Sequence, residues 1–433
     1  NTEFVADGNI SAGAPVILTS DGKAAEVVGS SSTTAAAAQT PDNWHSQAVN
    51  QVYSVWDTSN NKLVVLWSDS QNSNYGVYRI ASLDSSGTLT WGTKTTFYSY
   101  GTSMINAAYT KDGKIAIFFE DAGGSYWSRL VVGEISGTSM SIGSVVDMFP
   151  ANNYGYGVAY DTTNDVVVCV ITDYSTSYYG RARTATISGT TLTRGTAVTY
   201  RSANSDNSAI SYDSTLDKFL VTFREADGSN DLGGVVGTTS GNSISFGTPS
   251  TGDTSVYCTK TSSAYDPNAT RNLVSYYDAS TGNVRAVVAG IVGTNISWGT
   301  PITVEYTNNG VDYRMPVTYN ANIQKCIITY TIDGTGTAKY VIATVSGSNV
   351  TVGSAVTIDS GTYTTNMRQL TCPYDPVTKQ NILTGRQDSS SAPGDVGASI
   401  VFNQEYTTQT SNLTSTNLLG LAPEAISDTA TGT

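Results

Sequence analysis

An acidic residue recurs at a nearly constant place after a repeated aromatic marker. The markers are Trp56, Tyr109, Tyr160, Tyr212, Tyr265, Tyr319 and Tyr374. The acids follow 12 to 14 residues later and are Asp69, Asp121, Asp173, Glu225, Asp278, Asp333 and Asp388. An arginine often comes 7 to 10 residues after the acid, at Arg79, Arg129, Arg181 and Arg285. An aspartate here can begin a turn by accepting a hydrogen bond from its own backbone, and it can face an arginine across a hairpin. We therefore expect these acids to be structural. The sequence does not decide whether the acidic loops also bind Ca²⁺.

Aromatic residues crowd the stretches that follow the first three acids. They are Tyr75, Tyr126, Trp127, Tyr174, Tyr178 and Tyr179. Tyrosine and tryptophan offer a rigid amphipathic surface at a low cost in conformational entropy. The alternative is that they only complete the hairpins. If the loops share one face, the first three repeats predict a patch that binds sugar by stacking.

Catalytic motifs are absent from the sequence. It contains no P-loop, no G-x-S-x-G and no H-E-x-x-H pattern. His45 is the single histidine, so a mechanism that needs two histidines in one chain is excluded, and we expect His45 to pack or to donate a hydrogen bond. The many carboxylates leave a glycosidase pair as an alternative. The sequence predicts a protein that is not an enzyme and that needs no cofactor.

A period of about fifty residues underlies these spacings. A Gly-Thr or Gly-Ser phrase recurs at Gly92, Gly143, Gly195, Gly247, Gly299 and Gly353, in steps of 51, 52, 52, 52 and 54. Each copy divides into four short runs rich in β-forming residues, separated by turns such as "SGTT" and "SGNS". A four-stranded meander cannot bury both of its apolar faces alone, and stacking the copies solves this. The sequence predicts an all-β fold: a seven-bladed β-propeller of four-stranded antiparallel blades.

The seventh copy lacks the fourth strand and its Gly-Thr phrase. The stretch 24–34, "AAEVVGSSSTT", is similar to a fourth strand, so we predict that it closes the ring and that a stretch including "AQTPDNWH" loops out. The propeller then spans 25–405. Residues 1–24 and 406–433 do not fit the repeat and are expected to form the two halves of a small β anchoring module, as domain insertion favours.

Composition limits the partners. The net charge of −13 argues against nucleic acid, whose phosphates need clustered lysine and arginine. No apolar stretch approaches the ~20 residues of a membrane helix. The cysteines at 169, 258, 326 and 372 lack metal-ligand spacing, and buried free thiols are expected.

The two ends of the chain resemble the flanks of virion proteins from tailed bacteriophages, such as tail-fibre, spike and capsid-fibre components. The matching residues are Gly13, Val16, Leu18, Asp21 and Gly22 at one end, and Asn417, Leu419, Gly420, Leu421, Ala422, Ala425, Ile426, Asp428 and Gly432 at the other. About fifty residues carry this resemblance. It implies a virion structural protein on the particle surface, a homo-oligomer with other virion proteins as partners, and a host-surface glycan as receptor. A secreted lectin or adhesin propeller and a glycosidase-like propeller are the alternatives.

Overall fold

The computed structural model describes residues 4–6, 9–10, 15–18, 23–26, 31–35, 42–124, 126–307, 310–311, 314–333, 335–358, 367–387, 396–408, 418–421 and 431–432. The chain divides into two compact units, one of residues 1–36 with 404–433 and one of residues 37–403. Within the described ranges, no helix is long and apolar enough to cross a membrane.

The smaller unit is built from both ends of the chain. β1 (Phe4–Val5) pairs with β39 (Thr431–Gly432), and β2 (Pro15–Leu18) lies between β3 (Ala24–Glu26) and β38 (Leu418–Leu421). β4 (Ser31–Ala35) pairs with the last residues of β37 (Val396–Thr408). Ala6, Ile10 and Ala24 form its buried cluster.

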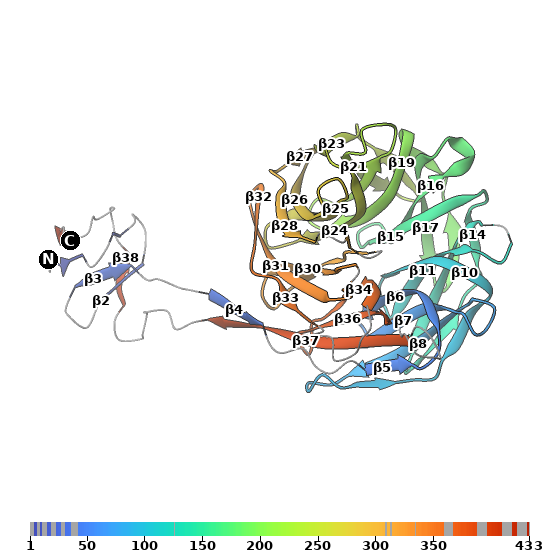
Figure 1. Ribbon diagram of the computed structural model, residues 1–433, viewed down its shortest axis with the longest axis horizontal. Helices are drawn as coiled ribbons and strands as arrows, with labels where there is room; N and C mark the ends of the chain where they lie inside the picture. The colour runs from blue at the N-terminus through green and yellow to red at the C-terminus, as the bar shows by residue number, and fades with distance from the viewer. Residues whose placement is uncertain are drawn as a thin grey trace. The chain divides into compact units, whose positions relative to one another are not determined.

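The larger unit repeats one antiparallel meander, and Figure 1 shows the sheets succeeding one another in colour order. The first two repeats form one continuous nine-stranded sheet, joined by the long strand β10. Its strands are β6 (Val49–Asp57), β7 (Lys62–Asp69), β8 (Tyr75–Leu83), β9 (Leu89–Trp91), β10 (Thr95–Tyr109), β11 (Lys114–Asp121), β12 (Ser128–Ser136), β13 (Ser139–Ile142) and β14 (Val146–Phe149). The next two repeats form a second nine-stranded sheet, joined by the long strand β19. Its elements are β15 (Asn153–Asp161), β16 (Val166–Asp173), the 3-10 turn η1 (Tyr174–Thr176), β17 (Tyr179–Ser188), β18 (Thr191–Arg194), β19 (Val198–Asp213), β20 (Lys218–Glu225), β21 (Leu232–Ser240), β22 (Ser243–Phe246) and β23 (Ser250–Asp253).

The remaining strands form three separate sheets. One contains β24 (Cys258–Asp266), β25 (Arg271–Asp278), β26 (Asn283–Val292), β27 (Asn295–Trp298) and β28 (Ile302–Tyr306), and the next contains β29 (Val317–Asn320), β30 (Lys325–Thr331), β31 (Ala338–Ser346), β32 (Asn349–Val352) and β33 (Val356–Thr357). The last contains β34 (Met367–Thr371), β35 (Tyr374–Asp375), β36 (Gln380–Gln387), β37 and β5 (Asp42–His45). The outer strand of each complete repeat comes in two pieces that pair with the same third strand, as β13 and β14 do with β12.

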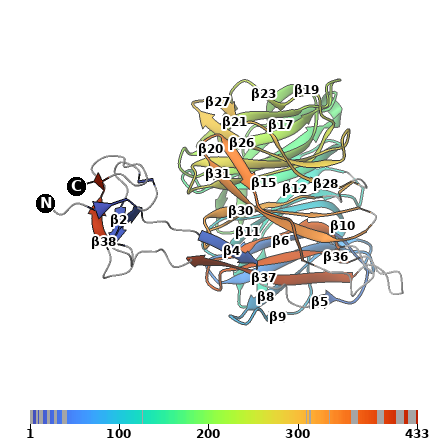
Figure 2. The ribbon, with the colours of Figure 1, turned by 60° about the vertical axis from the view of Figure 1, so that its left-hand side comes forward.

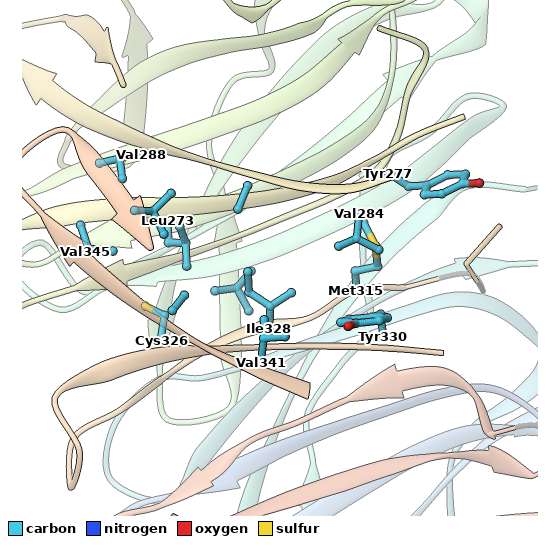
Figure 3. Close-up of a cluster of buried hydrophobic side chains, with 14 of the residues drawn as sticks. Leu273, Tyr277, Val284, Val288, Met315, Cys326, Ile328, Tyr330, Val341 and Val345 are labelled. Atoms are coloured by element: carbon cyan, nitrogen blue, oxygen red, sulfur yellow. The ribbon is translucent and has the colours of Figure 1, made fainter. Parts of the chain in front are cut away.

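The core lies between consecutive sheets, which Figure 2 shows layered one on the next. Every residue of β16, "VVVCVITD", is buried, because neighbouring sheets cover both of its faces. Leu273 of β25 packs with Ile328 of β30 and Val341 of β31 in the cluster of Figure 3. The last sheet packs on the first in the same way, since Ile382 of β36 shares a cluster with first-repeat strands. All four cysteines are buried free thiols, as predicted.

The repeated glycine allows a close approach between neighbouring repeats. A Cβ added at Gly247 would lie 2.0 Å from the Thr294 carbonyl oxygen, in the turn between the third and outer strands of the next repeat. Gly143, Gly195 and Gly299 meet the same turn of their own next repeat. The repeated glycine of one copy therefore contacts the turn between the third and outer strands of the next copy.

The aromatic marker also joins repeats. The Tyr109 hydroxyl lies 2.7 Å from the Ser59 hydroxyl of the preceding repeat. The Tyr265 hydroxyl donates to Thr215 in the same way at 2.5 Å. The aspartate after the marker holds its own turn, since Asp266 accepts hydrogen bonds from the two backbone N–H groups that follow. These contacts need the same residue types at the same spacing in each repeat, which explains the period in the sequence.

The strand pairing of the last sheet differs from the prediction for residues 24–34. Ala24–Glu26 pairs with β2, whereas β5, Asp42–His45, occupies the place beside β37 with Gly397 opposite His45. The stretch "DNWH" is therefore a strand and does not loop out. Burial of Trp44 against Trp67, with ring centroids 4.9 Å apart, explains this choice better than the β-propensity of 24–34 does.

Candidate functional site

Two kinds of connection meet at one edge of the larger unit. Antiparallel pairing puts the end of each second strand beside the start of a first strand, as Asp173 opposite Asn153 and Asp278 opposite Cys258 show. The loops from second to third strand and the crossings between repeats therefore share an edge. We call this edge, with loops such as 70–74, 122–127 and 174–178, the loop face.

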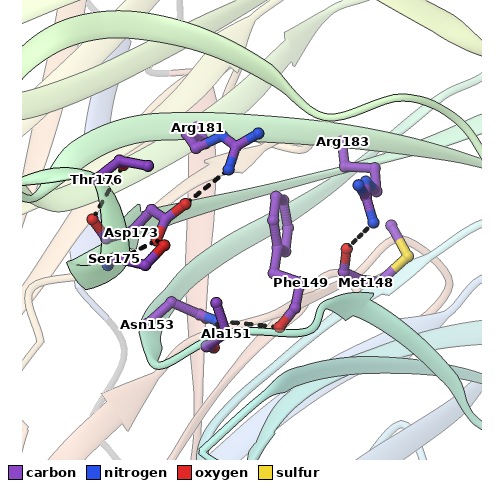
Figure 4. A network of polar contacts seen from close by, with 9 residues as sticks. All are labelled: Met148, Phe149, Ala151, Asn153, Asp173, Ser175, Thr176, Arg181 and Arg183. Atoms are coloured by element: carbon purple, nitrogen blue, oxygen red, sulfur yellow. Dashed lines mark hydrogen bonds and ion pairs between the residues drawn. The ribbon is translucent and has the colours of Figure 1, made fainter.

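The predicted acids lie at this edge, and the described aspartates of the first five repeats are buried. Asp173 begins η1 by accepting a hydrogen bond from the Ser175 backbone N–H at 2.9 Å, and it pairs with Arg181 at 2.7 Å (Figure 4). Burial alone would raise the pKa of Asp173, but the Ser175 hydroxyl and the Arg181 guanidinium outweigh it and lower that pKa. Asp121 repeats the pattern with the Gly123 N–H and with Arg129.

The other acids have different partners. Asp69 pairs with Lys94 at 2.8 Å, and Asp278 accepts from Ser280 and Thr281. Burial raises the pKa of Glu225. Asp333 is half-exposed and lies 3.7 Å from Arg368. Asp388 falls outside the described residues.

Two of the four predicted arginine partners do not pair with the acid of their own loop. Arg79 donates to the carbonyl oxygens of Gly92 and Trp44. Arg285 pairs with Asp253 of the preceding repeat at 3.0 Å. These cations stabilise sheets or join them. Among the described residues, no group of three or more His, Cys, Asp or Glu could hold a metal ion.

The predicted aromatic residues divide by exposure. Tyr126 and Tyr178 are exposed, at 50% and 48%, whereas Tyr75, Trp127, Tyr174 and Tyr179 are half-buried. The Tyr178 ring stands edge-on to Tyr174 with centroids 4.8 Å apart, and Tyr174 stands edge-on to Tyr154 at 4.9 Å.

Three further exposed tyrosines were missed in the sequence. They are Tyr100, Tyr257 and Tyr306, with exposed fractions of 62%, 42% and 60%. They follow the repeated glycine by 7 to 10 residues, in or near the crossings, whereas the aromatic pattern was sought only after the second strands. With Tyr126 and Tyr178 they are the exposed aromatic side chains of the described chain, and all five belong to the loop face.

A cavity of about 480 Å³ opens among the first strands, close to the loop face. A β-bulge recurs there in the first strand, and Gln51, Asn207 and Lys260 take φ values of 53°, 49° and 55° at it. Arg314 crosses between repeats and donates to the Ile105 carbonyl at 2.9 Å and to a carbonyl of β6 at 3.2 Å. Amides, hydroxyls and the two cations Lys260 and Arg314 thus line the cavity together with apolar side chains such as Met104 and Ile210.

A smaller groove of about 270 Å³ lies between the first two repeats. Asn74, Thr102 and Gly123 line it, and Gln51 belongs to both hollows. The exposed Tyr100 adjoins this groove through Gly101. Polar hydrogen-bonding groups and an aromatic ring therefore lie together on the loop face.

No family model matches the chain, and no curated protein matches it either. Solved structures do match its fold. A lectin of Burkholderia pseudomallei, BP39L, has a TM-score of 0.55 at 12% identity over 88% of this chain and 99% of its own. The chain is all-β and propeller-like. The periplasmic gluconolactonase of Pseudomonas aeruginosa has a TM-score of 0.53 at 9% identity over 72% of this chain and 86% of its own. A protein from Lactobacillus plantarum has a TM-score of 0.51 at 13% identity over 86% and 98%.

These matches correct one prediction. The sequence predicted a protein that is not an enzyme, but a gluconolactonase shares this fold, so that prediction is wrong as it was made. It rested on missing motifs, and a fold that serves both binding and hydrolysis does not need the motifs that were sought. None of the three structures is named as a virion protein, so the virion role remains a prediction.

Proposed function

We propose that this chain is a seven-bladed propeller that binds carbohydrate through its loop face. Seven copies of the meander, the pairing of β5 with β37 and the cluster that joins the last sheet to the first support a closed ring. Closure of a ring of blades buries both faces of every sheet and leaves only short, protected sheet edges.

One observation carries the binding function: the five exposed tyrosines gather on one face. Tyr100 and Tyr306 are among the most exposed large side chains, although burial of an aromatic ring is strongly favourable. A phenol ring offers a flat apolar surface to the C–H face of a pyranose and a hydroxyl to its oxygens. Asn74 and Thr102 in the groove add donors and acceptors of the kind that fix a sugar's orientation.

The lectin match supports this proposal at the level of the fold. We place the protein outside the cytoplasm, where surface glycans are found. Attachment to a host surface as part of a virion, in an oligomer with other virion proteins, remains compatible with the same binding face.

The test compares two sets of exposed residues on a glycan array. A variant with Tyr100→Ala, Tyr126→Ala and Tyr306→Ala should lose at least tenfold in affinity for the glycans that the wild type binds. The matched control replaces Val292 and Val377 with alanine. Val292 ends β26 and Val377 lies in a turn, both away from the loop face, and they are 65% and 62% exposed. Equal melting temperatures would show that folding is intact. Wild-type protein that binds no glycan, or equal loss in both variants, would refute the proposal.

A second candidate is hydrolysis of a sugar lactone in the larger cavity. The observation in its favour is the cavity of about 480 Å³, whose mixed lining includes Lys260, Arg314 and amide side chains. A gluconolactone hydrolysis assay, with Lys260→Met as the comparison, tests it. Turnover that the substitution leaves unchanged would locate the reaction elsewhere, and no turnover would reject this candidate.

A further inference from the structure

One position in the second-to-third strand loop requires a left-handed backbone in repeat after repeat. Its N–H closes the loop by donating to the carbonyl of the loop's first acid, as Asn74 does to Asp69 at 3.0 Å and Asn230 to Glu225 at 2.9 Å. In two later repeats a glycine closes a loop one residue shorter, with Gly282 donating to the Asp278 carbonyl and Gly336 to the Ile332 carbonyl, at φ values of 75° and 67°. Asparagine and glycine are the residues that tolerate this conformation best.

Two repeats place tyrosine at this position. Tyr126 has φ 52° and donates to the Asp121 carbonyl at 2.8 Å, and Tyr178 has φ 65° and donates to the Asp173 carbonyl at 3.0 Å. A bulky side chain with this backbone is an outlier, because its Cβ crowds the carbonyl oxygen. The loop itself is the same as the one that Asn74 closes, so the fold does not require the ring.

Burial does not compensate for the strained backbone. Both rings are about half-exposed. Tyr178 contacts Tyr174 edge-on at 4.8 Å, which fixes the direction of its ring but leaves much of it open to solvent. Strain that brings no packing in return is typical of residues held for a ligand.

We infer that Tyr126 and Tyr178 are the primary sugar-stacking residues of the loop face, an inference that rests on the proposed carbohydrate function. Each presents its ring to the apolar face of a pyranose. The two tyrosines lie in the second-to-third strand loops of adjacent repeats. The ligand class is therefore an oligosaccharide with more than one accessible pyranose face.

The inference predicts opposite signs for stability and binding. Tyr126→Asn and Tyr178→Asn restore the residue that the loop prefers, so each should raise the Tm by about 1 °C while weakening oligosaccharide binding at least tenfold. The matched control, Asn230→Tyr, should lower the Tm by a similar amount and leave binding unchanged. If either tyrosine had only a structural role, its replacement would lower the stability of the protein.

Isothermal titration with the best glycan from the array, paired with thermal unfolding, measures both quantities. If Tyr126→Asn and Tyr178→Asn bind like the wild type while the Tyr100 and Tyr306 variants lose affinity, the carbohydrate function stands and this inference falls. Lower stability in both asparagine variants would also overturn it. A wild type that binds no glycan would overturn the inference together with the function.

Discussion

A methyl group at Gly247 should separate two neighbouring repeats. The added Cβ would lie 2.0 Å from the Thr294 carbonyl oxygen and 3.0 Å from the Thr294 Cβ, while contacts below 3.0 Å are essentially never seen. The turn that contains Thr294 would have to move by at least 1.0 Å, the difference between 3.0 and 2.0 Å. Overpacking of this kind costs about 1–3 kcal/mol, and the loss of glycine's freedom in the unfolded chain returns about 0.4–1 kcal/mol. We expect Gly247→Ala to lower the free energy of unfolding by about 1–2 kcal/mol.

The chain contains a matched control for this substitution. Gly353 makes the same backbone hydrogen bond as Gly247, to Ile342 at 3.0 Å against Val236 at 2.9 Å. A Cβ at Gly353 would meet nothing closer than the Ile342 carbonyl at 3.9 Å. Gly353→Ala should therefore be neutral or stabilising by about 0.4–1 kcal/mol. Denaturant unfolding of both variants measures the difference, and equal stabilities would refute the view that the repeated glycine exists for the contact between repeats.

Three further substitutions test the contacts between repeats. Burial, followed by the charge of Lys94, lowers the pKa of His45 below 6.5, so the folded state prefers the neutral ring. The free energy of unfolding should therefore fall as the pH drops below about 6.5. Thermal unfolding between pH 7.5 and 5.5 measures this fall, and His45→Gln should flatten it. Arg314→Ala leaves two carbonyls of the first two repeats without this donor and should cost about 1–3 kcal/mol, whereas unchanged denaturant unfolding would contradict the bridging role. Glu305→Gln removes the charge that Lys339 contacts at 2.5 Å across a repeat boundary and should cost about 1–3 kcal/mol, with a smaller effect in high salt if the pair is electrostatic.

The repeat and its strands could be predicted from the sequence because their causes are local and periodic. The marker at Tyr265 and Asp266 combines a turn that aspartate caps with a hydroxyl contact to the previous repeat, and both depend on residue type at a fixed spacing. Which N-terminal segment pairs with β37 could not be predicted in the same way. That pairing accompanies the burial of Trp44 against Trp67, a contact between residues of different strands that leaves no period in the sequence.

The candidate site was only partly visible in the sequence for a similar reason. The pattern indicated Tyr126 and Tyr178 but could not separate them from the half-buried Tyr75, since exposure depends on how each loop ends. Tyr257 was missed because it lies in a crossing rather than after a second strand, although its N–H donates to Asp278 of the adjacent loop at 3.1 Å. The loop face becomes apparent only when antiparallel pairing brings these two kinds of connection to one edge.

Positions that preserve the repeat and positions that break it have different causes in this molecule. Gly247 preserves the repeat, and the closeness of Thr294 explains it fully. Tyr126 and Tyr178 break it at a position where Asn74 and the equivalent residues of other repeats satisfy the backbone. Packing explains the first kind of residue in the copies where neighbouring repeats approach closely, but it cannot account for an exposed residue that only two copies have and that the backbone disfavours. Ligand binding can, because it acts on the few copies that the ligand reaches.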